Sequence, residues 1–206
     1  MKKIFSLLLV TLLLISVTAL AESTAPVYEY VDVPVDSTIK LDGDFSIRFS
    51  IERVDGKCDS GLLFYLDDAG DSYGFKVRWN DNNRADFYGV KNVGGTWKGF
   101  LIADEYQEFL KDCFVSVDEG WDTTQDTQME LTITVQGTMA TVTMKGNVTG
   151  KEGTIHFDLT KSPWLDFEEK EATPLVLSSG TTRFDLNGGN VLSFSVDSAT
   201  YAANQK

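Results

Sequence analysis

Histidine and cysteine are scarce in this 206-residue chain, which contains one histidine and two cysteines. No C-x-x-C pair, zinc-ligand cluster or phosphate-cradling glycine loop is present. The enzyme classes that carry those signatures are therefore not indicated. A Ser-His-Asp triad stays open, because triads are assembled in space and not in sequence. His156 alternates with Ile155 and Phe157, and a lone histidine on a strand is expected to be structural.

Basic residues are also few, 18 against 31 acidic ones, and the net charge is -13. Such a surface repels nucleic acid and anionic lipid, which argues against both as partners. It suits neutral ligands or cations. The alternative is that the charge serves only solubility outside the cell.

Long apolar runs are absent except at the N-terminus, where Ile4–Val17 follows Lys2 and Lys3. This run is shorter than the ~20 residues that a spanning helix needs, and a small-x-small cleavage site ends at Ala21. Residues 1–21 are therefore predicted to be a secretory signal peptide, with an uncleaved anchor as the alternative. Residues 22–26 are then a short tail and 27–206 a single domain. The sequence predicts a secreted, periplasmic or cell-surface protein with no membrane span.

The two cysteines are Cys58 and Cys113. An exported chain meets oxidising conditions, so a disulfide between them is predicted. The alternative is two free, buried thiols.

Hydrophobic residues recur with a period of two along most of the chain, which is typical of half-buried strands. Glycine-rich turns separate the segments. The expected strands lie at 44–54, 60–66, 72–79, 84–90, 129–146 (a hairpin), 153–159, 173–179, 181–186 and 190–201. Helical spacing occurs at Ile102–Asp112. The predicted fold class is all-β: a two-sheet antiparallel β-sandwich (jelly roll) with one short helical insertion.

The order of "DGDFSIRFSIE", "SGLLFYL", "YGFKVRW", "ELTITVQGTMATVTMKG", "GTIHFDL" and "VLSFSVDSATY" resembles the concanavalin A-like lectin/glucanase superfamily, which includes laminin G-like jelly rolls. The resemblance covers nearly the whole mature chain and consists of alternation patterns. It implies two packed antiparallel sheets, one of them concave and holding a glycan. It also implies a structural calcium ion, with Asp42, Gly43 and Asp197 as the matching positions. The alternative is that these residues are only the ordinary polar residues of a turn and a strand edge. No cofactor is otherwise required.

Glucanases of this fold carry E-x-D-x-E on one strand, which places the nucleophile and the acid/base on one face. The nearest match is "WLDFE" at 164–168, in which Trp164 stands where the nucleophilic glutamate should be. The motif is therefore absent, and the sequence leans away from an enzyme.

An acidic loop contains Asp67, Asp68 and Asp71. Carboxylates are calcium ligands, but the spacing matches neither the EF-hand loop nor a glycine-aspartate repeat. Aspartate and glycine also favour tight turns. The turn interpretation is favoured over a metal site.

Sugars bind by stacking on aromatic rings, while polar side chains contact their hydroxyls. The alternative is that these rings only cap the core. The ring candidates are Tyr73, Trp79, Tyr88, Trp97 and Trp121, with Asn82 and Arg84 as hydrogen-bonding neighbours.

The leading hypothesis is a non-catalytic domain that binds a polysaccharide or oligosaccharide. One alternative is a glycoside hydrolase or lyase whose catalytic residues are unrecognised, and another is an extracellular protein-interaction domain. An enzyme needs two carboxylates converging near an aromatic ring, whereas a protein binder needs a flat apolar patch.

Overall fold

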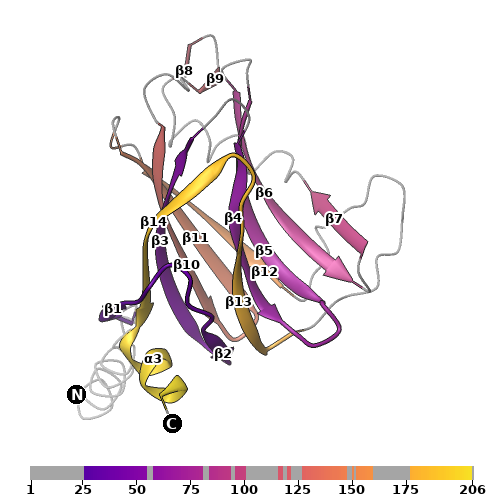
Figure 1. Cartoon of the computed structure of the whole chain (residues 1–206), viewed down its shortest axis with the longest axis vertical. Coiled ribbons are helices and arrows are strands. Elements are labelled where there is room, and N and C mark those ends of the chain that lie inside the picture. Colours follow the sequence, from indigo (N-terminus) through magenta and orange to yellow (C-terminus); the bar gives the residue numbers. More distant parts are fainter. Residues whose placement is uncertain are drawn as a thin grey trace, which may run out of the picture.

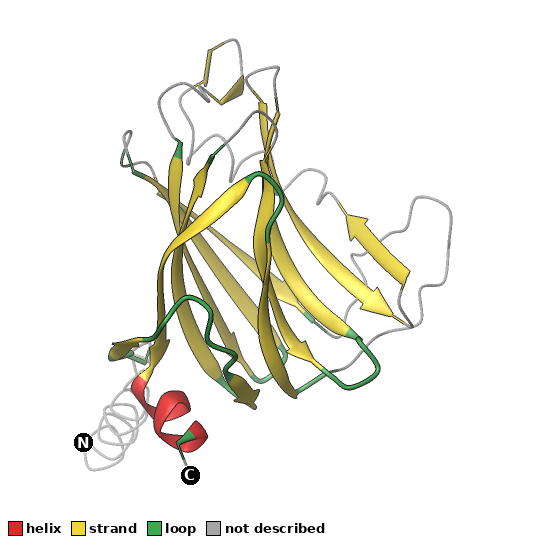
Figure 2. Ribbon diagram, viewed as in Figure 1, coloured by secondary structure: helices red, strands yellow, loops and turns green. Residues whose placement is uncertain are grey.

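The computed structural model describes residues 26–54, 58–80, 84–93, 96–100, 116–117, 120–121, 127–147, 150, 152–159 and 177–205. Two antiparallel six-stranded sheets pack around one apolar core (Figures 1 and 2). The predicted all-β sandwich is therefore confirmed. The predicted signal peptide, the helix at 102–112 and the "WLDFE" segment lie outside the described residues.

The first sheet has the order β1-β14-β3-β10-β11-β12. Its strands are β1 (Tyr30–Asp32), β14 (Gly189–Asp197), β3 (Phe45–Arg53), β10 (Gln128–Gln136), β11 (Met139–Gly146) and β12 (Glu152–Asp158). The second sheet has the order β2-β13-β4-β5-β6-β7. Its strands are β2 (Lys40–Asp42), β13 (Ser179–Asp185), β4 (Cys58–Leu66), β5 (Ser72–Asn80), β6 (Arg84–Val93) and β7 (Thr96–Phe100). A separate pair is formed by β8 (Ser116–Val117) and β9 (Gly120–Trp121).

The last predicted strand is too long, because the chain turns into a helix at its end. β14 stops at Asp197, and α3 (Ser198–Asn204) follows it. The Asp197 carboxylate accepts a hydrogen bond from Thr200 N, which caps the helix and ends the strand. Among the described residues, no helix is long and apolar enough to cross a bilayer.

Strict alternation builds the core. In β3, Phe45, Ile47, Phe49 and Ile51 are at most 1% exposed, whereas Arg48 between them is exposed. Burying each such side chain contributes about 1.5–3 kcal/mol relative to leaving it in water. The same alternation continues in β10 and β11, so the predicted hairpin at 129–146 is confirmed.

A β-bulge interrupts the alternation in β4. Tyr65 adopts a left-handed backbone conformation with φ 53°, and the pairing of β4 with β13 shifts between Thr181 and Arg183. Consecutive rings, Phe64 and Tyr65, therefore both enter the core, where they meet edge-on with 5.4 Å between centroids. Tyr73 joins the same cluster at 1% exposure, so of the two alternatives for this ring the structure supports packing in the core.

Candidate functional site

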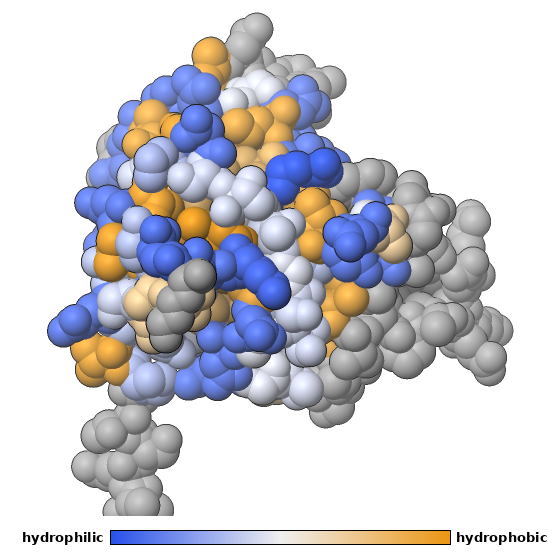
Figure 3. Space-filling model, turned by 60° about the horizontal axis from the view of Figure 1, so that its bottom comes forward, coloured by the Kyte–Doolittle hydropathy of each residue, from blue (hydrophilic) through white to orange (hydrophobic). Residues whose placement is uncertain are grey.

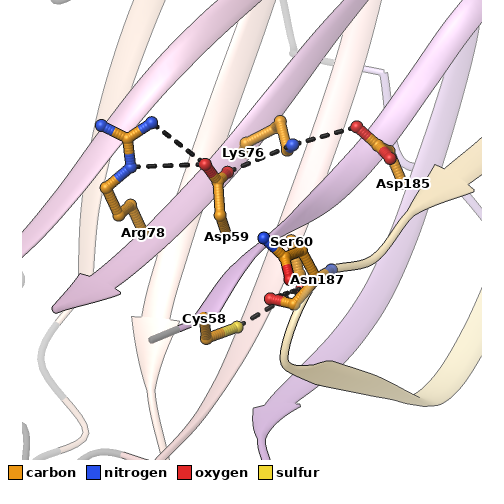
Figure 4. Close-up of polar contacts among 7 residues, drawn as sticks. All are labelled: Cys58, Asp59, Ser60, Lys76, Arg78, Asp185 and Asn187. Atoms are coloured by element: carbon orange, nitrogen blue, oxygen red, sulfur yellow. Dashed lines mark hydrogen bonds and ion pairs between the residues drawn. The ribbon is translucent and has the colours of Figure 1, made fainter. Parts of the chain in front are cut away.

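The face of the second sheet that points away from the core carries a group of charged side chains. Asp59 on β4 alternates with the buried residues Cys58 and Ser60, and Lys76 and Arg78 on β5 alternate with buried Val77. The period of two therefore directs the charged residues outward. Together with Asp185 on β13 they form what we call the charged cluster: Asp59, Lys76, Arg78 and Asp185 (Figure 4).

Lys76 is the centre of the charged cluster. Its ammonium nitrogen lies 3.1 Å from Asp59 Oδ1 and 2.9 Å from Asp185 Oδ2. Arg78 binds the other oxygen of Asp59, with Nη2 at 3.0 Å and Nε at 3.3 Å. Lys76 is only 8% exposed, whereas the Arg78 side chain is 45% exposed. The cluster therefore has a covered centre and an accessible margin.

Gly61 explains how Lys76 reaches a residue two strands away. Gly61 pairs with Lys76 on one side and with Asp185 on the other, so the three positions form a row across the sheet. Two strand spacings separate the outer positions by about 9–10 Å. Because glycine has no side chain, the lysine can cross β4 at this point. A Cβ at Gly61 would lie 1.9 Å from Phe75 O, so the backbones also approach closely here.

The row continues onto β6. Tyr88 pairs with Lys76, and Asp86 pairs with Arg78. Residues directly opposite one another in a sheet occupy the same face. The predicted sugar-binding position Tyr88 therefore neighbours the charged cluster in the register.

The other predicted sugar-binding positions are more dispersed, and the structure describes their backbone only. Trp79 pairs with Cys58, a core residue, and so occupies the opposite face from Tyr88. Trp97 on β7 pairs with Asn92. Arg84 begins β6, and Trp121 belongs to β9, which lies against β6. Asn82 lies outside the described residues.

The residues predicted to bind calcium have structural partners. Asp197 is 5% exposed, and its carboxylate accepts hydrogen bonds from Ser46 N and Thr200 N, each at 3.0 Å. Gly43 O accepts a hydrogen bond from the Tyr65 hydroxyl. Asp42 is exposed at the end of β2. In the part of the chain that the structure describes, no three acidic, histidine or cysteine side chains are grouped to hold a metal ion. The calcium site stays a prediction.

The acidic loop is a turn, as predicted. Asp67 Oδ1 accepts hydrogen bonds from Ala69 N at 2.9 Å and from Asp71 N at 2.8 Å. Gly70 adopts φ 87°, a conformation that glycine permits without strain. The Asp67 carboxylate therefore organises the β4–β5 connection.

His156 has a contact that fits a structural role. It is exposed on β12, and its Nδ1 lies 2.9 Å from the Thr141 hydroxyl on the neighbouring strand. Cross-strand pairs of this kind stabilise a sheet by fractions of a kcal/mol, about 0.2–1.

Cys58 is buried, and its thiol is free in the structure. Desolvation raises the pKa of this thiol, and Sγ donates a hydrogen bond to Ser60 Oγ at 3.4 Å. Cys113 lies outside the described residues, so the disulfide stays a prediction.

Sequence reasoning missed the charged cluster. Asp59, Lys76 and Arg78 occupy outward positions of two predicted neighbouring strands, and that signal was available. The contribution of Asp185 was not, because nothing in the sequence indicates that β13 pairs with β4.

No protein-family model matches the chain, and neither does any curated protein. Among solved structures, a xylan beta-1,4-xylosidase from Bacillus halodurans C-125 aligns at 12% identity with a TM-score of 0.46, over 83% of this chain and 30% of that one. Scytalido-glutamic peptidase aligns at 11% identity with a TM-score of 0.39, covering 81% and 66%. The CBM2 module of the evolved Dit of Lactobacillus casei BL23 phage J-1 aligns at 11% identity with a TM-score of 0.40, covering 82% and 65%. These TM-scores are all below 0.5.

Proposed function

We propose that this chain is a secreted, non-catalytic carbohydrate-binding domain of the concanavalin A-like type. The outward face of the second sheet is its ligand face. The observation that carries the proposal is the row Asp185–Gly61–Lys76–Tyr88, which aligns an acceptor, a donor and an aromatic residue across four neighbouring strands. Polar groups that fix hydroxyls beside a ring that stacks on the sugar are the usual elements of a glycan site.

The same geometry favours binding over two-carboxylate hydrolysis. Asp59 and Asp185 converge, and this is the feature that would favour a glycoside hydrolase. Such enzymes hold the scissile bond between their two carboxyl groups. Here the Lys76 ammonium occupies that space, at 3.1 and 2.9 Å from the two carboxylates. Release of reducing ends from a bound polysaccharide would show that the protein is a glycoside hydrolase and not a non-catalytic binding domain.

A protein-interaction role is less favoured by the surface. On the face that Figure 3 shows, apolar residues are interspersed with polar ones and form no broad patch. The most exposed large apolar residues of the described part come from separate elements, namely Val27, Val35, Val54, Met139, Leu186 and Leu192.

A glycan-array screen of the exported protein, with calcium and with chelator, tests the proposal. We expect saturable binding that Tyr88→Ala reduces about fivefold or more, because stacking of one aromatic ring contributes on the order of 1 kcal/mol or more. Tyr30→Ala is the matched control, since it removes the same ring from the first sheet. Binding to no glycan, or equal loss in both variants, would contradict the proposal.

A further inference from the structure

We propose that Asn187 is a site of spontaneous deamidation, and that its conversion to aspartate and isoaspartate weakens the joint between the two sheets. Asn187 and Gly188 lie between β13 of the second sheet and β14 of the first. Asparagine is one of the thermolabile residue types, and Asn187 is the only asparagine of the sequence that is followed by glycine. The site belongs to the chain itself and does not depend on which ligand the protein binds.

The side chain of Asn187 is free to react. It is exposed, and its amide forms no hydrogen bond with any residue that the structure describes; Asn187 bonds only through its backbone N and O. An unrestrained side chain can rotate to place its Cγ beside the next backbone nitrogen. The other asparagines whose side chains are described all donate a hydrogen bond from the amide: Asn92 to Gly70 O, Asn147 to Gln128, Asn190 to Glu52 and Asn204 to Thr200 O.

The nucleophile is the backbone nitrogen of Gly188. Its N–H donates to no residue in the described part of the chain, so a base in the solvent can remove the proton. Glycine has no Cβ, so nothing on residue 188 obstructs the approach of this nitrogen to the amide carbon of Asn187. Asn190, by contrast, is followed by the β-branched Val191, which crowds the same approach.

The reaction of Asn187 needs only water. The Gly188 nitrogen forms a bond to Asn187 Cγ, and the bond from Cγ to Nδ2 breaks. The departing nitrogen takes up a proton in place of the one that Gly188 lost and leaves as ammonia, so that a cyclic imide remains. Water then adds to one of the two imide carbonyls. Cleavage of the new bond at Cγ gives aspartate, whereas cleavage at the backbone carbonyl carbon gives isoaspartate, in which the main chain runs through Cβ and Cγ.

The backbone of this joint is anchored to β4 and to the end of β3. Asn187 O accepts a hydrogen bond from Asp59 N at 2.8 Å, and Asn187 N donates one to Ser60 Oγ at 3.1 Å (Figure 4). Gly188 O accepts a hydrogen bond from Val54 N at 3.0 Å. Isoaspartate adds one carbon to the main chain between these anchored groups, and the carbonyl group of residue 187 becomes a carboxylate. At least one of the three hydrogen bonds must then lengthen or break.

The surrounding packing leaves no room for the added carbon. A Cβ placed on the next residue, Gly189, would lie 2.6 Å from Ser60 Oγ and 2.9 Å from Cys58 Sγ. Close-packed interiors transmit such strain instead of absorbing it. Both products also add a carboxylate two residues after Asp185, in a chain whose net charge is already -13. The modified joint should therefore hold β13 and β14 less firmly.

Peptide mapping of the aged protein tests the site. The full exported protein is incubated at mildly alkaline pH and digested at acidic pH, and fragmentation spectra locate each acid form. We expect the acid form to accumulate about tenfold or more faster at Asn187 than at Asn190, which corresponds to a barrier lower by about 1.4 kcal/mol. An isoaspartyl methyltransferase should label the peptide that contains position 187. Equal or slower conversion at Asn187, or a product without isoaspartate, would overturn the inference.

Asn187→Gln is the matched control for the effect on stability. It keeps the amide but lengthens the side chain by one carbon, so the ring that must close is larger and forms more slowly. After the same incubation, the deamidated fraction of the unmodified sequence, separated by anion exchange, should have a Tm about 4 °C or more below that of the control. Equal Tm values would overturn the effect on the joint. If Asn187→Gln does not fold, the fresh protein serves as the reference and the same comparison decides.

Asn187→Asp separates the added charge from the added carbon. It carries the carboxylate on an ordinary main chain, so its Tm should fall less than that of the deamidated fraction. An equal fall would overturn the role assigned to the inserted carbon.

Discussion

Replacement of Asp197 by alanine should destabilise the protein through hydrogen bonding, whether or not calcium is present. One oxygen of this carboxylate accepts from Ser46 N on β3, and the other accepts from Thr200 N in the first turn of α3. The residue is 5% exposed, so water cannot replace either contact fully. Asp197 therefore ties the ends of β3 and β14 to the start of the helix.

The loss of these two hydrogen bonds sets the size of the expected decrease in the free energy of unfolding. Loss of an N-cap costs about 1 kcal/mol, and a buried N–H left without an acceptor costs about 1–3 kcal/mol. Asp197→Ala should thus lower the free energy of unfolding by about 2–4 kcal/mol, which corresponds to a fall in Tm of about 4–16 °C for a chain of this size. Asp197→Asn keeps one acceptor oxygen and should lose roughly half as much.

Thermal and urea unfolding with calcium and with chelator measure the effect. The expected result is the same loss for Asp197→Ala in both conditions, and a change within about 0.5 kcal/mol for exposed Asp42→Ala. If chelator alone destabilises the unmodified protein, and both variants abolish that difference, then Asp42 and Asp197 act as calcium ligands. That result would refute the hydrogen-bonding account.

Three further predictions follow from the packing and the thiols. Gly61→Ala should cost about 3 kcal/mol or more, because its Cβ would lie 1.9 Å from Phe75 O; a loss below ~1 kcal/mol in urea unfolding would mean that the strands separate easily. Burial raises the pKa of the Tyr65 phenol above its ordinary value of 10.0, so the native state keeps a proton that the unfolded chain releases, and stability should fall as the pH rises above 10.0. Tyr65→Phe should lose about 1 kcal/mol at neutral pH and show a shallower decline at high pH. Mass analysis of the exported protein should show the loss of two hydrogen atoms for a Cys58–Cys113 disulfide, and alkylation of both thiols in the unfolded, unreduced protein would exclude it.

The fold was predictable because its main signal is local. Alternating residues such as Phe45, Ile47 and Phe49 identify a strand without knowledge of its neighbours. The end of β14 was not predictable from alternation. It depends on the Asp197 carboxylate accepting hydrogen bonds from two backbone N–H groups, one of which lies in the first turn of α3. The role of Tyr73 was left open between a sugar-binding ring and a core ring for a related reason. Its ring lies on the core face, and a lone period-two pattern does not say which face is inward.

The candidate site was predictable only in part. Tyr88 was selected for its ring, and the register places it opposite Lys76. Asp185 comes from a strand more than a hundred residues later in the chain, so its place depends on the order of strands in the sheet. Strand order is a property of tertiary packing, and hydrophobic alternation carries no information about it.

The order of strands also determines when the two sheets can be completed during folding. β13 lies between β2 and β4, and β14 lies between β1 and β3, so each sheet receives an interior strand from the last part of the chain (Figure 1). Until residues 179–197 are available, β1 and β2 have no partner in their sheets, and β3 and β4 each keep one open edge. Pairings this distant in sequence make folding slow. A chain truncated before β13 would expose strand edges in both sheets and should aggregate instead of forming a smaller sandwich.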